Sequence, residues 1–419
     1  MVLFSPLSLP NTPIIRDKHY PALDGLRGIA ALMVVAHHSA FSYGMTGFFD
    51  KAYLRATSLL WVGVDLFFVL SGFLITNILL ETKHSPNYFR TFYARRFLRI
   101  FPLYYAFLAV LYFLVPLLGS PLPESLTSVQ AWQWTYTSNI YVGFHGWSNQ
   151  NINHLWSLSI EEQFYLVWPL LVLILREQNL KEAIVGLLLF LPFIRSVCLS
   201  IGLPAYFITS FTLCRMDGLL LGALISLMLR EGLLEKIRLP QFSRILKRLD
   251  WTVTILVAAF IVVYCILRND QFLFNALTWP WYGQCIGFSL VSLPLAYIVF
   301  RSIADGPSRL KRILEARPLR AVGKYSYALY LLHAPIVFWA GAHFPVPNVL
   351  KSLPPQWSFL HSIYIIFVQF TLSIFAAILS WHIIEKHFLK LKKYFRYRPA
   401  PPETVLSGNA SIVIGEAIA

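Results

Sequence analysis

The sequence predicts an all-α integral membrane protein: a bundle of about ten transmembrane helices with both termini in the cytoplasm. The prediction rests on the composition, the length of the apolar stretches and the placement of the basic residues. Of the 419 residues, 57% are hydrophobic and 13% are charged, and the mean hydropathy is +0.60. Soluble domains are about one quarter charged. The composition therefore excludes that class and favours a multi-pass protein of the cell membrane, embedded in the lipid bilayer.

Ten stretches of the chain are apolar over the length of about 20 residues that a helix needs to cross a bilayer. The first residues have neither the basic nor the apolar region of a cleavable signal peptide, so we expect the first span to direct insertion. No internal repeat is evident. The predicted spans are 23–43, 59–81, 97–119, 155–176, 182–203, 206–229, 251–268, 280–301, 322–344 and 359–385.

The basic residues test this count, because the cytoplasmic loops of membrane proteins carry an excess of Lys and Arg. With the N-terminus inside, 28 of the 35 Lys and Arg fall on the inner side and 4 on the outer side. One span fewer would invert half of this map and destroy the asymmetry. The sequence therefore predicts a cytoplasmic segment 1–20, a membrane domain 21–388, and a cytoplasmic basic segment with a flexible tail, 389–419.

The net charge of +15 does not indicate a nucleic-acid partner, since the basic residues form short blocks between apolar segments and suit anionic lipid headgroups. The four cysteines lie in apolar segments without a CxxC pair, which indicates buried thiols. Glycine-rich phosphate loops, GxSxG elbows and HExxH zinc helices are absent from the sequence. We expect neither a metal site nor a tightly bound cofactor.

The first span, "DGLRGIAALMVVAHH", carries ionisable residues, which cost about 2.5 to 3.5 kcal/mol each at the centre of a bilayer. Arg27 and His38 are eleven residues apart, so in a helix they lie about 20° apart around the axis and about 16 Å apart along it. His37 points about 80° away from Arg27, and Asp24 is placed to pair with Arg27.

One face of this helix thus offers a cation near the cytoplasm and an imidazole deeper in the membrane. This arrangement suits an elongated anionic ligand whose reactive end meets His38, which we expect to move protons, while Arg27 holds anionic or carbonyl oxygen atoms. The alternative is that Arg27 reaches out to lipid headgroups and a neighbouring helix satisfies His38.

The fourth span opens with "HLWSLSIEEQFYLVWP", in which two acids enter the membrane. His154, Glu161 and Tyr165 lie on one side of this helix, at offsets of seven and four residues. We expect Glu161 to orient or charge a histidine of another helix, whereas Glu162 points elsewhere.

Two later segments also place polar side chains in the membrane. In "GKYSYALYLLHAPI" of the ninth span, Ser326 and Tyr330 share the face of His333, which lies about half-way across. In "CRMDG", near the start of the sixth span, we expect Arg215 and Asp217 to neutralise each other. All five are candidate substrate-binding residues.

The second and third spans supply further candidates. "GVDLFFVLSGFLIT" begins with Asp65 near the outer surface, and its Ser71–Gly72 pair favours close helix packing. "FYARRFLRIFPLYY" places Arg95, Arg96 and Arg99 at the inner mouth of the third span. These arginines either follow the positive-inside rule or clamp the phosphates of a nucleotide-like ligand.

The outer loop 120–154 contains no Lys or Arg but several aromatic residues among Asn and Gln. These rings suit either stacking on sugars or an interfacial belt. They are Trp132, Trp134, Tyr136, Tyr141 and Trp147.

A proton-coupled transporter is the competing class, because such carriers also bury charges in a helical bundle. The lack of repeated halves disfavours it. A purely structural protein would leave the alignment of Arg27 with His38 unexplained.

The five motifs "DGLRGIAALMVVAHH", "GVDLFFVLSGFLIT", "RRFLRIFPLYY", "HLWSLSIEEQFYLVWP" and "SYALYLLHAPI" resemble, in order, the motif set of the acyltransferase 3 family. Members O-acylate sugars of lipopolysaccharide, exopolysaccharide, Nod factors and peptidoglycan, and some acylate macrolides. The resemblance covers residues 20 to 387. Another, unrelated class of membrane-bound O-acyltransferases also uses an intramembrane histidine, but its motifs match less well.

The resemblance implies roles for individual residues. The family signature of an Arg followed after ten residues by a His corresponds to Arg27 and His38, its acid in the fourth motif to Glu161, and its late histidine to His333. His38 would act as general base, or as a covalent acyl carrier, with Glu161 or Asp24 orienting the acid–base machinery. The late "E-x-P" element of the family survives here only as "EKH", which makes Glu385 a weak match.

The resemblance also implies the substrates. The acyl donor would be acyl-CoA, and most often acetyl-CoA, entering from the cytoplasm as a co-substrate, with Arg27, Arg95, Arg96 and Arg99 at its phosphates. The acceptor would be a carbohydrate or glycolipid at a bacterial inner membrane, or alternatively a macrolide-like small molecule. Many members continue into an extracytoplasmic SGNH hydrolase-like domain, which we expect to be missing here because only about thirty residues follow the last predicted span. We expect either transfer by this chain alone or a separate extracytoplasmic partner.

Overall fold

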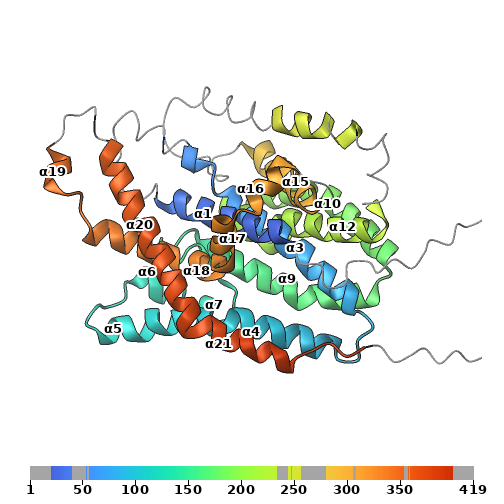
Figure 1. Ribbon diagram of the computed structural model, residues 1–419, viewed down its shortest axis with the longest axis horizontal. Helices are drawn as coiled ribbons and strands as arrows, with labels where there is room; N and C mark the ends of the chain where they lie inside the picture. Colours follow the sequence, from blue (N-terminus) through green and yellow to red (C-terminus); the bar gives the residue numbers. More distant parts are fainter. Residues whose placement is uncertain are drawn as a thin grey trace, which may run out of the picture.

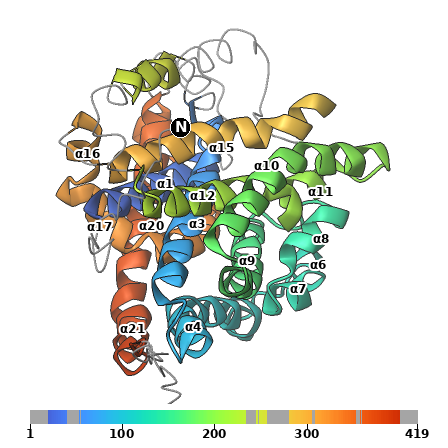
Figure 2. The same ribbon diagram turned by 90° about the vertical axis from the view of Figure 1, so that its right-hand side faces the viewer.

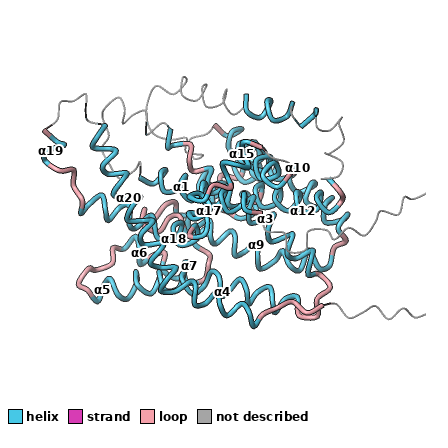
Figure 3. The backbone as a smooth tube through the Cα atoms, in the orientation of Figure 1, coloured by secondary structure: helices cyan, strands magenta, loops and turns pink. Residues whose placement is uncertain are grey.

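The computed structural model describes residues 20–39, 53, 56–233, 244–246, 248–255, 280–304, 308–352, 357 and 359–399. Regular structure in these ranges is entirely helical, as Figure 3 shows. The α-helices are α1 (Pro21–Ser39), α3 (Val62–Thr82), α4 (Tyr88–Ala109), α5 (Val115–Leu117), α6 (Glu124–Thr127), α7 (Gln130–Trp134), α8 (Ser138–His145), α9 (Leu155–Ile174), α10 (Glu177–Ser200), α11 (Ala205–Ser210), α12 (Asp217–Arg230), α15 (Trp281–Ile303), α16 (Arg309–Leu314), α17 (Arg317–Lys324), α18 (Ser326–His343), α19 (Asn348–Lys351), α20 (Phe359–Ser380) and α21 (Lys386–Lys390).

Short stretches of other helix types interrupt or extend these α-helices. Two are π-helical turns, a geometry that is often found at functional sites. They are η2 (Val110–Leu114) and η6 (Trp381–Glu385), and the 3-10 turns are η3 (Thr212–Arg215) and η7 (Leu391–Tyr394).

Six helical segments within the described ranges are long and apolar enough to cross a membrane. They agree with six of the ten predicted spans. The segments differ in how much of their most apolar stretch is buried inside the protein. This share is 56% in the segment that contains α3 and 17% in α10, so α10 turns most of its apolar surface outward. Such surface is stable against lipid, and the chain is a multi-pass membrane protein. The segments are Ala56–Thr82, Tyr88–Leu117, Leu155–Ile174, Glu177–Ser200, Trp281–Ile303 and Phe359–Tyr394.

The remaining four predicted spans differ. Helix α1 occupies the predicted span 23–43 as far as Ser39, and the predicted span 251–268 lies mostly outside the described residues. The predicted span 206–229 is divided into α11, η3 and α12, and the predicted span 322–344 into α17 and α18. The count of ten and the cytoplasmic placement of both termini therefore stay predictions.

Helix α1 lies inside the bundle, where it packs against α3, α17 and α18 (Figures 1 and 2). Helix α12 packs against α3, and α4 lies beside α21. Glycines allow the closest approaches: a Cβ atom at Gly25 would lie 1.9 Å from the carbonyl oxygen of Leu314, and one at Gly72 would lie 1.9 Å from that of Leu219. The packing role predicted for Gly72 is therefore confirmed.

Candidate active site

Three histidines from separate parts of the chain meet inside the bundle, and we call His38, His154 and His333 the histidine cluster. His38 lies at the C-terminal end of α1, His154 immediately precedes α9, and His333 lies in the middle of α18. The His38 and His333 rings are 4.9 Å apart between centroids, and the His154 and His333 rings are 5.0 Å apart. His154 and His333 are buried, while His38 is partly exposed.

Backbone carbonyl groups fix which nitrogen of each ring carries the proton, because a carbonyl oxygen only accepts hydrogen bonds. His333 Nδ1 lies 2.6 Å from the Tyr330 oxygen, so Nδ1 carries the proton and Nε2 of the neutral ring is an acceptor. His38 Nδ1 lies 3.0 Å from the Val34 oxygen and 3.2 Å from His333 Nε2, so it also carries the proton and donates. The basic nitrogen of neutral His38 is therefore Nε2.

His154 adopts the opposite tautomer. Its Nε2 lies 3.0 Å from the Leu331 oxygen and donates to it, which leaves Nδ1 as the acceptor. This Nδ1 is buried and has no hydrogen-bond partner within the described part of the chain. Each of the three rings is thus hydrogen-bonded to a backbone carbonyl oxygen, and the rings are not directed at one point. Among the described residues, no group of three His, Cys, Asp or Glu side chains is placed to hold a metal ion.

Tyr330 joins the helices that carry His154 and His333. Its hydroxyl donates to the His154 carbonyl oxygen at 3.1 Å and makes a short hydrogen bond with Ser157 Oγ. The Tyr330 and His333 rings both lie against the ring of His154, at 5.7 and 5.0 Å between centroids, so the two side chains share one side of α18. Ser326 is buried at the start of the same helix, two turns from His333.

Glu161 of α9 contacts neighbouring helices, but its observed partners are not histidines. Its Oε1 accepts from Ser71 Oγ at 2.9 Å, and its Oε2 accepts from the Tyr165 hydroxyl at 3.2 Å. The Arg96 guanidinium lies 5.6 Å from the centroid of the Tyr165 ring. The role of Glu161 in orienting a histidine stays a prediction.

Five basic residues gather at the other end of α1, and we call Arg27, Arg95, Arg96, Arg99 and Lys392 the basic cluster. Arg27 interacts electrostatically with Arg99 and Arg96, and Lys392 interacts with all four arginines. The cluster therefore lies toward the start of α1, and the histidine cluster lies at its end.

Four acids border the basic cluster: Glu161 and Glu162 interact electrostatically with Arg96, and Asp24 and Glu385 lie near other members. Arg27 and Asp24 approach to 4.0 Å, the i,i+3 pair that the sequence predicts. Glu385, in the π-helical turn η6, interacts with Arg99, and its Oε1 is buried without a hydrogen-bond partner in the described chain. Beyond the spans, burial raises the pKa of Tyr397, which also lies near Arg95 and Arg96.

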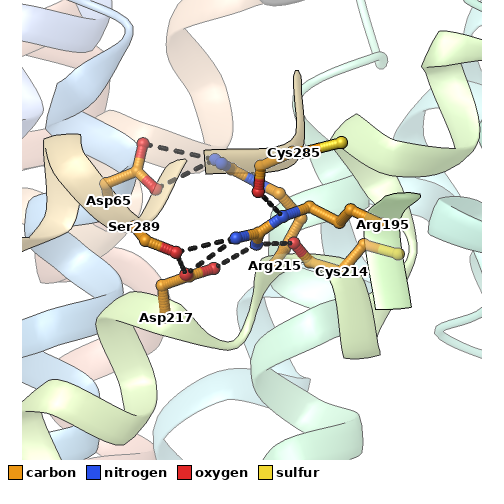
Figure 4. A network of polar contacts seen from close by, with 7 residues as sticks. All are labelled: Asp65, Arg195, Cys214, Arg215, Asp217, Cys285 and Ser289. Atoms are coloured by element: carbon orange, nitrogen blue, oxygen red, sulfur yellow. Dashed lines mark hydrogen bonds and ion pairs between the residues drawn. The ribbon is translucent and has the colours of Figure 1, made fainter. Parts of the chain in front are cut away.

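A second group of buried charges, which we call the ion-pair network, consists of Asp65, Arg195, Arg215 and Asp217 (Figure 4). Arg195 Nη1 lies 2.8 Å from Asp217 Oδ2, and Arg215 Nη2 lies 3.0 Å from Asp65 Oδ1. All four side chains are at most 2% exposed. The expectation that Arg215 neutralises Asp217 is wrong, because residues two positions apart face different sides, and Arg215 meets Asp65 while Asp217 meets Arg195.

Arg195 is held on several sides. It also donates to the carbonyl oxygens of Cys214 and Cys285, at 2.9 and 2.6 Å, and to Ser289 Oγ at 2.7 Å. Arg215 stacks on the Phe288 ring at 3.8 Å, while its Nε and Nη1 have no hydrogen-bond partner in the described chain. Substrate binding by Asp65, Arg215 and Asp217 stays a prediction.

The aromatic residues of the outer loop are largely packed. Trp134 stacks on Tyr105 and Tyr136 stacks on Tyr104, with ring centroids 5.6 and 4.1 Å apart, which anchors the loop to α4. Trp147 remains 38% exposed. Of the predicted sugar platform, Trp147 is thus the ring with the most room for stacking on a ligand.

Sequence reasoning missed four residues that structure the site: Ser71, Ser157, Arg195 and Lys392. Ser71 lies in the motif "GVDLFFVLSGFLIT" and Ser157 in "HLWSLSIEEQFYLVWP". A polar residue in an otherwise apolar helix is the feature of the sequence that could have indicated them. Arg195 falls within the predicted span 182–203, where a charged residue in an apolar stretch is the available signal. Lys392 was counted only as one of the cytoplasmic basic residues.

Comparison with known proteins decides the family. The acyltransferase domain of the acyltransferase 3 family matches residues 20–385. The chain belongs to the acyltransferase 3 family. This match includes all three members of the histidine cluster and every arginine of the basic cluster, but ends before Lys392.

Relatives of this acyltransferase 3 chain are named as O-acetyltransferases, two of them for peptidoglycan. It is 30% identical over 335 residues to the peptidoglycan O-acetyltransferase OatA of Listeria monocytogenes, covering 76% of this chain and 50% of the relative. It is 30% identical over 386 residues to the putative peptidoglycan O-acetyltransferase YrhL of Bacillus subtilis, and 27% identical over 396 residues to the O-acetyltransferase OatA of Staphylococcus aureus. Each of these two matches covers 88% of this chain, with 55% and 57% of the relative.

The chain thus spans about half the length of the curated relatives that it matches. No solved structure shows significant similarity to it.

Proposed function

We propose that this chain is a membrane O-acetyltransferase that moves an acetyl group from cytoplasmic acetyl-CoA to a hydroxyl of an extracytoplasmic or lipid-linked carbohydrate. Membership of the acyltransferase 3 family supports acyl transfer. The observation that carries the mechanism is the contact of 3.2 Å between His38 Nδ1 and His333 Nε2, because it leaves His38 Nε2 as a base.

In the proposed reaction, His38 Nε2 takes the proton of the acceptor hydroxyl while the oxygen of that hydroxyl attacks the thioester carbonyl carbon. The carbon–sulfur bond then breaks, and the proton passes from His38 to the departing CoA thiolate. General-base catalysis of this kind contributes about 10²- to 10⁴-fold to a rate. The imidazolium formed on the way keeps its Nδ1–H bonded to the Val34 oxygen and to His333 Nε2, which favours the charged form.

The proposed donor fits the layout of α1. The four arginines of the basic cluster would hold the phosphates. The thioester would reach His38 through the pantetheine arm, across about 16 Å of helix between Arg27 and His38. Arginine is suited to phosphate because its guanidinium donates two parallel hydrogen bonds.

The proposed acceptor is a cell-wall carbohydrate. The names of the Listeria and Bacillus relatives support it, since both are given as peptidoglycan O-acetyltransferases. Trp147 offers a partly exposed aromatic ring in the outer loop, 6.3 Å from the ring of Trp156, which in turn lies 5.6 Å from the Arg215 guanidinium.

The proposal is tested by transfer of label from ¹⁴C-acetyl-CoA to cell-envelope carbohydrate in membranes that contain equal amounts of folded protein. Wild type should transfer label, and His38→Ala should lose about 10²- to 10⁴-fold. His37→Ala is the matched control: His37 is adjacent but contacts the Thr57 carbonyl oxygen at 3.1 Å, so its removal should change transfer by less than about 3-fold.

Retained transfer in folded His38→Ala would exclude both the general base and a covalent acyl-histidine. Absence of transfer by wild type to any envelope carbohydrate would contradict the proposed reaction and favour a carrier.

A further inference from the structure

The C-terminal segment 391–398 folds back against the start of α4. Asn87 Nδ2 donates to the Arg396 carbonyl oxygen at 2.8 Å, and the Arg398 amide donates to Asn87 Oδ1 at 3.0 Å. Arg95 Nη1 donates to the Phe395 carbonyl oxygen at 3.0 Å. The segment is therefore attached to the helix that carries three arginines of the basic cluster.

This attachment orients two adjacent lysines differently. Lys392 is partly buried and interacts electrostatically with Arg99, Arg96, Arg95 and Arg27. Lys393 is exposed, and its Nζ lies 4.9 Å from the centroid of the Tyr394 ring. One lysine thus joins the basic cluster while its neighbour faces away from it.

Four of the five charges of the basic cluster are not neutralised by direct pairing within the described residues, whereas Arg27 lies 4.0 Å from Asp24. Among the residues that the structure describes, no carboxylate oxygen lies within the 4.0 Å of an ion pair from Arg95, Arg96, Arg99 or Lys392. The nearby Glu161 is instead bonded to Ser71 and Tyr165.

Holding four or five cations together costs free energy through mutual repulsion, and the cost is larger where solvent is excluded. Elsewhere in this fold, buried arginines are neutralised: Arg195 and Arg215 each pair with an aspartate. Unpaired cations held in one place fit an anionic ligand of several charges, and phosphate is the group that Arg and Lys bind best together.

We propose that Lys392, presented by the docked C-terminal segment, completes a phosphate site with Arg95, Arg96 and Arg99, and that this site binds the phosphates of acyl-CoA. The assignment of the donor rests on the proposed function. The assignment of Lys392 rests on its placement, and it makes the segment after the last span part of the substrate site.

The test is calorimetric titration of the full chain, purified in neutral detergent, with CoA. Lys392→Ala should weaken CoA binding by about 10-fold, as expected for one lost charge-assisted contact. Lys393→Ala should change it by less than about 2-fold, since that side chain is exposed, and Lys392→Arg should restore most of the affinity. Thermal unfolding of each variant checks that the segment and the fold are retained.

Two further titrations distinguish binding of the CoA phosphates by Lys392 from binding of the pantetheine arm and of lipid phosphate. Binding of S-acetyl-pantetheine, which lacks the nucleotide and the diphosphate, should be equally weak in wild type and Lys392→Ala. Titration of the same proteins with vesicles that contain phosphatidylglycerol tests whether the cluster instead binds lipid phosphate.

The outcomes are distinct. If wild type binds CoA and Lys392→Ala binds it equally well, the inference about Lys392 is wrong and the proposed donor stands. If Lys392→Ala loses phosphatidylglycerol binding but not CoA binding, the site serves lipid and the inference is also wrong. If wild type binds no CoA, the proposed donor fails, and this inference fails with it.

Discussion

The histidine cluster and the ion-pair network both bury polar side chains between membrane helices, yet these side chains find their hydrogen-bond and ion-pair partners in different ways. In the ion-pair network, each arginine meets an aspartate, and Arg195 also donates to two carbonyl oxygens and a serine. In the histidine cluster, backbone carbonyls take up one N–H of each ring and leave a second nitrogen unprotonated.

We infer from this difference that the ion-pair network holds the bundle together, and we propose that the histidine cluster carries the chemistry. Buried charges that neutralise one another have less capacity for a substrate, although Nε and Nη1 of Arg215 have no hydrogen-bond partner in the described chain. A neutral histidine with a fixed tautomer keeps one basic atom. Burial of an ionisable residue in the membrane is therefore a weaker indicator of catalysis than the state of its partners. Three variants would test this division, since they should separate loss of stability from loss of activity.

The largest effect on stability is expected for Arg195→Met. It leaves Asp217 as an uncompensated buried charge and removes the donors from the Cys214 and Cys285 carbonyl oxygens, so we expect a loss of about 3 to 5 kcal/mol in the free energy of unfolding. Unfolding in mixed detergent micelles measures it.

Arg230→Met provides the control for Arg195→Met. Arg230 pairs with Glu177 at 3.2 Å, but that pair is partly exposed, so its loss should cost less than about 1 kcal/mol. Equal losses in the two variants would show that the ion-pair network has no special structural role.

An intermediate effect, on activity rather than stability, is expected for His333→Ala. Without His333 Nε2, the imidazolium of His38 loses an acceptor for its Nδ1–H, and we expect acetyl transfer to fall by about 10- to 100-fold. His333→Asn, whose carbonyl oxygen also accepts, should recover part of the rate. The measurement is the labelled acetyl transfer assay, with kcat separated from KM.

His343→Ala is the control on the same helix, because His343 is exposed and bonded to the Trp339 carbonyl oxygen. It should leave transfer unchanged. A loss in His333→Ala that His333→Asn does not reduce would indicate a packing role for this side chain and not an acceptor role.

The smallest effect is expected for Tyr330→Phe, which keeps the ring and removes one hydroxyl. The lost bonds to Ser157 and to the His154 carbonyl oxygen should cost about 1 kcal/mol of stability. Activity should fall a few-fold, because His154 and His333 then lose a shared anchor. Parallel unfolding and transfer assays on Tyr330→Phe and wild type check both values, and no change in either would show that the hydroxyl does not link the two helices.

Part of this site could be predicted from the sequence because it depends on a single helix. The 100° step of the α-helix placed Arg27 and His38 on one face and Tyr330 beside His333. The basic cluster was predicted in part, since Arg95, Arg96 and Arg99 lie within five residues of one another.

Contacts between distant segments could not be predicted in this way. The pairing of Arg195 with Asp217 depends on the break at η3, which the apolar run 206–229 conceals, because the pattern of apolar residues does not report where a helix is interrupted. The meeting of His38, His154 and His333 depends on the packing of three helices. Lys392 was indistinguishable from Lys393 by sequence, and the docking of the segment 391–398 separates them.

The most direct test of the account is the protonation of His38, observed by ¹⁵N magnetic resonance of histidine-labelled protein in a bilayer near neutral pH, with the signal assigned by its absence from His38→Ala. The account predicts a neutral ring that carries its proton on Nδ1, and a change of this signal in His333→Ala. A proton on Nε2 would contradict it, because the nitrogen proposed to take the acceptor's proton would already be occupied.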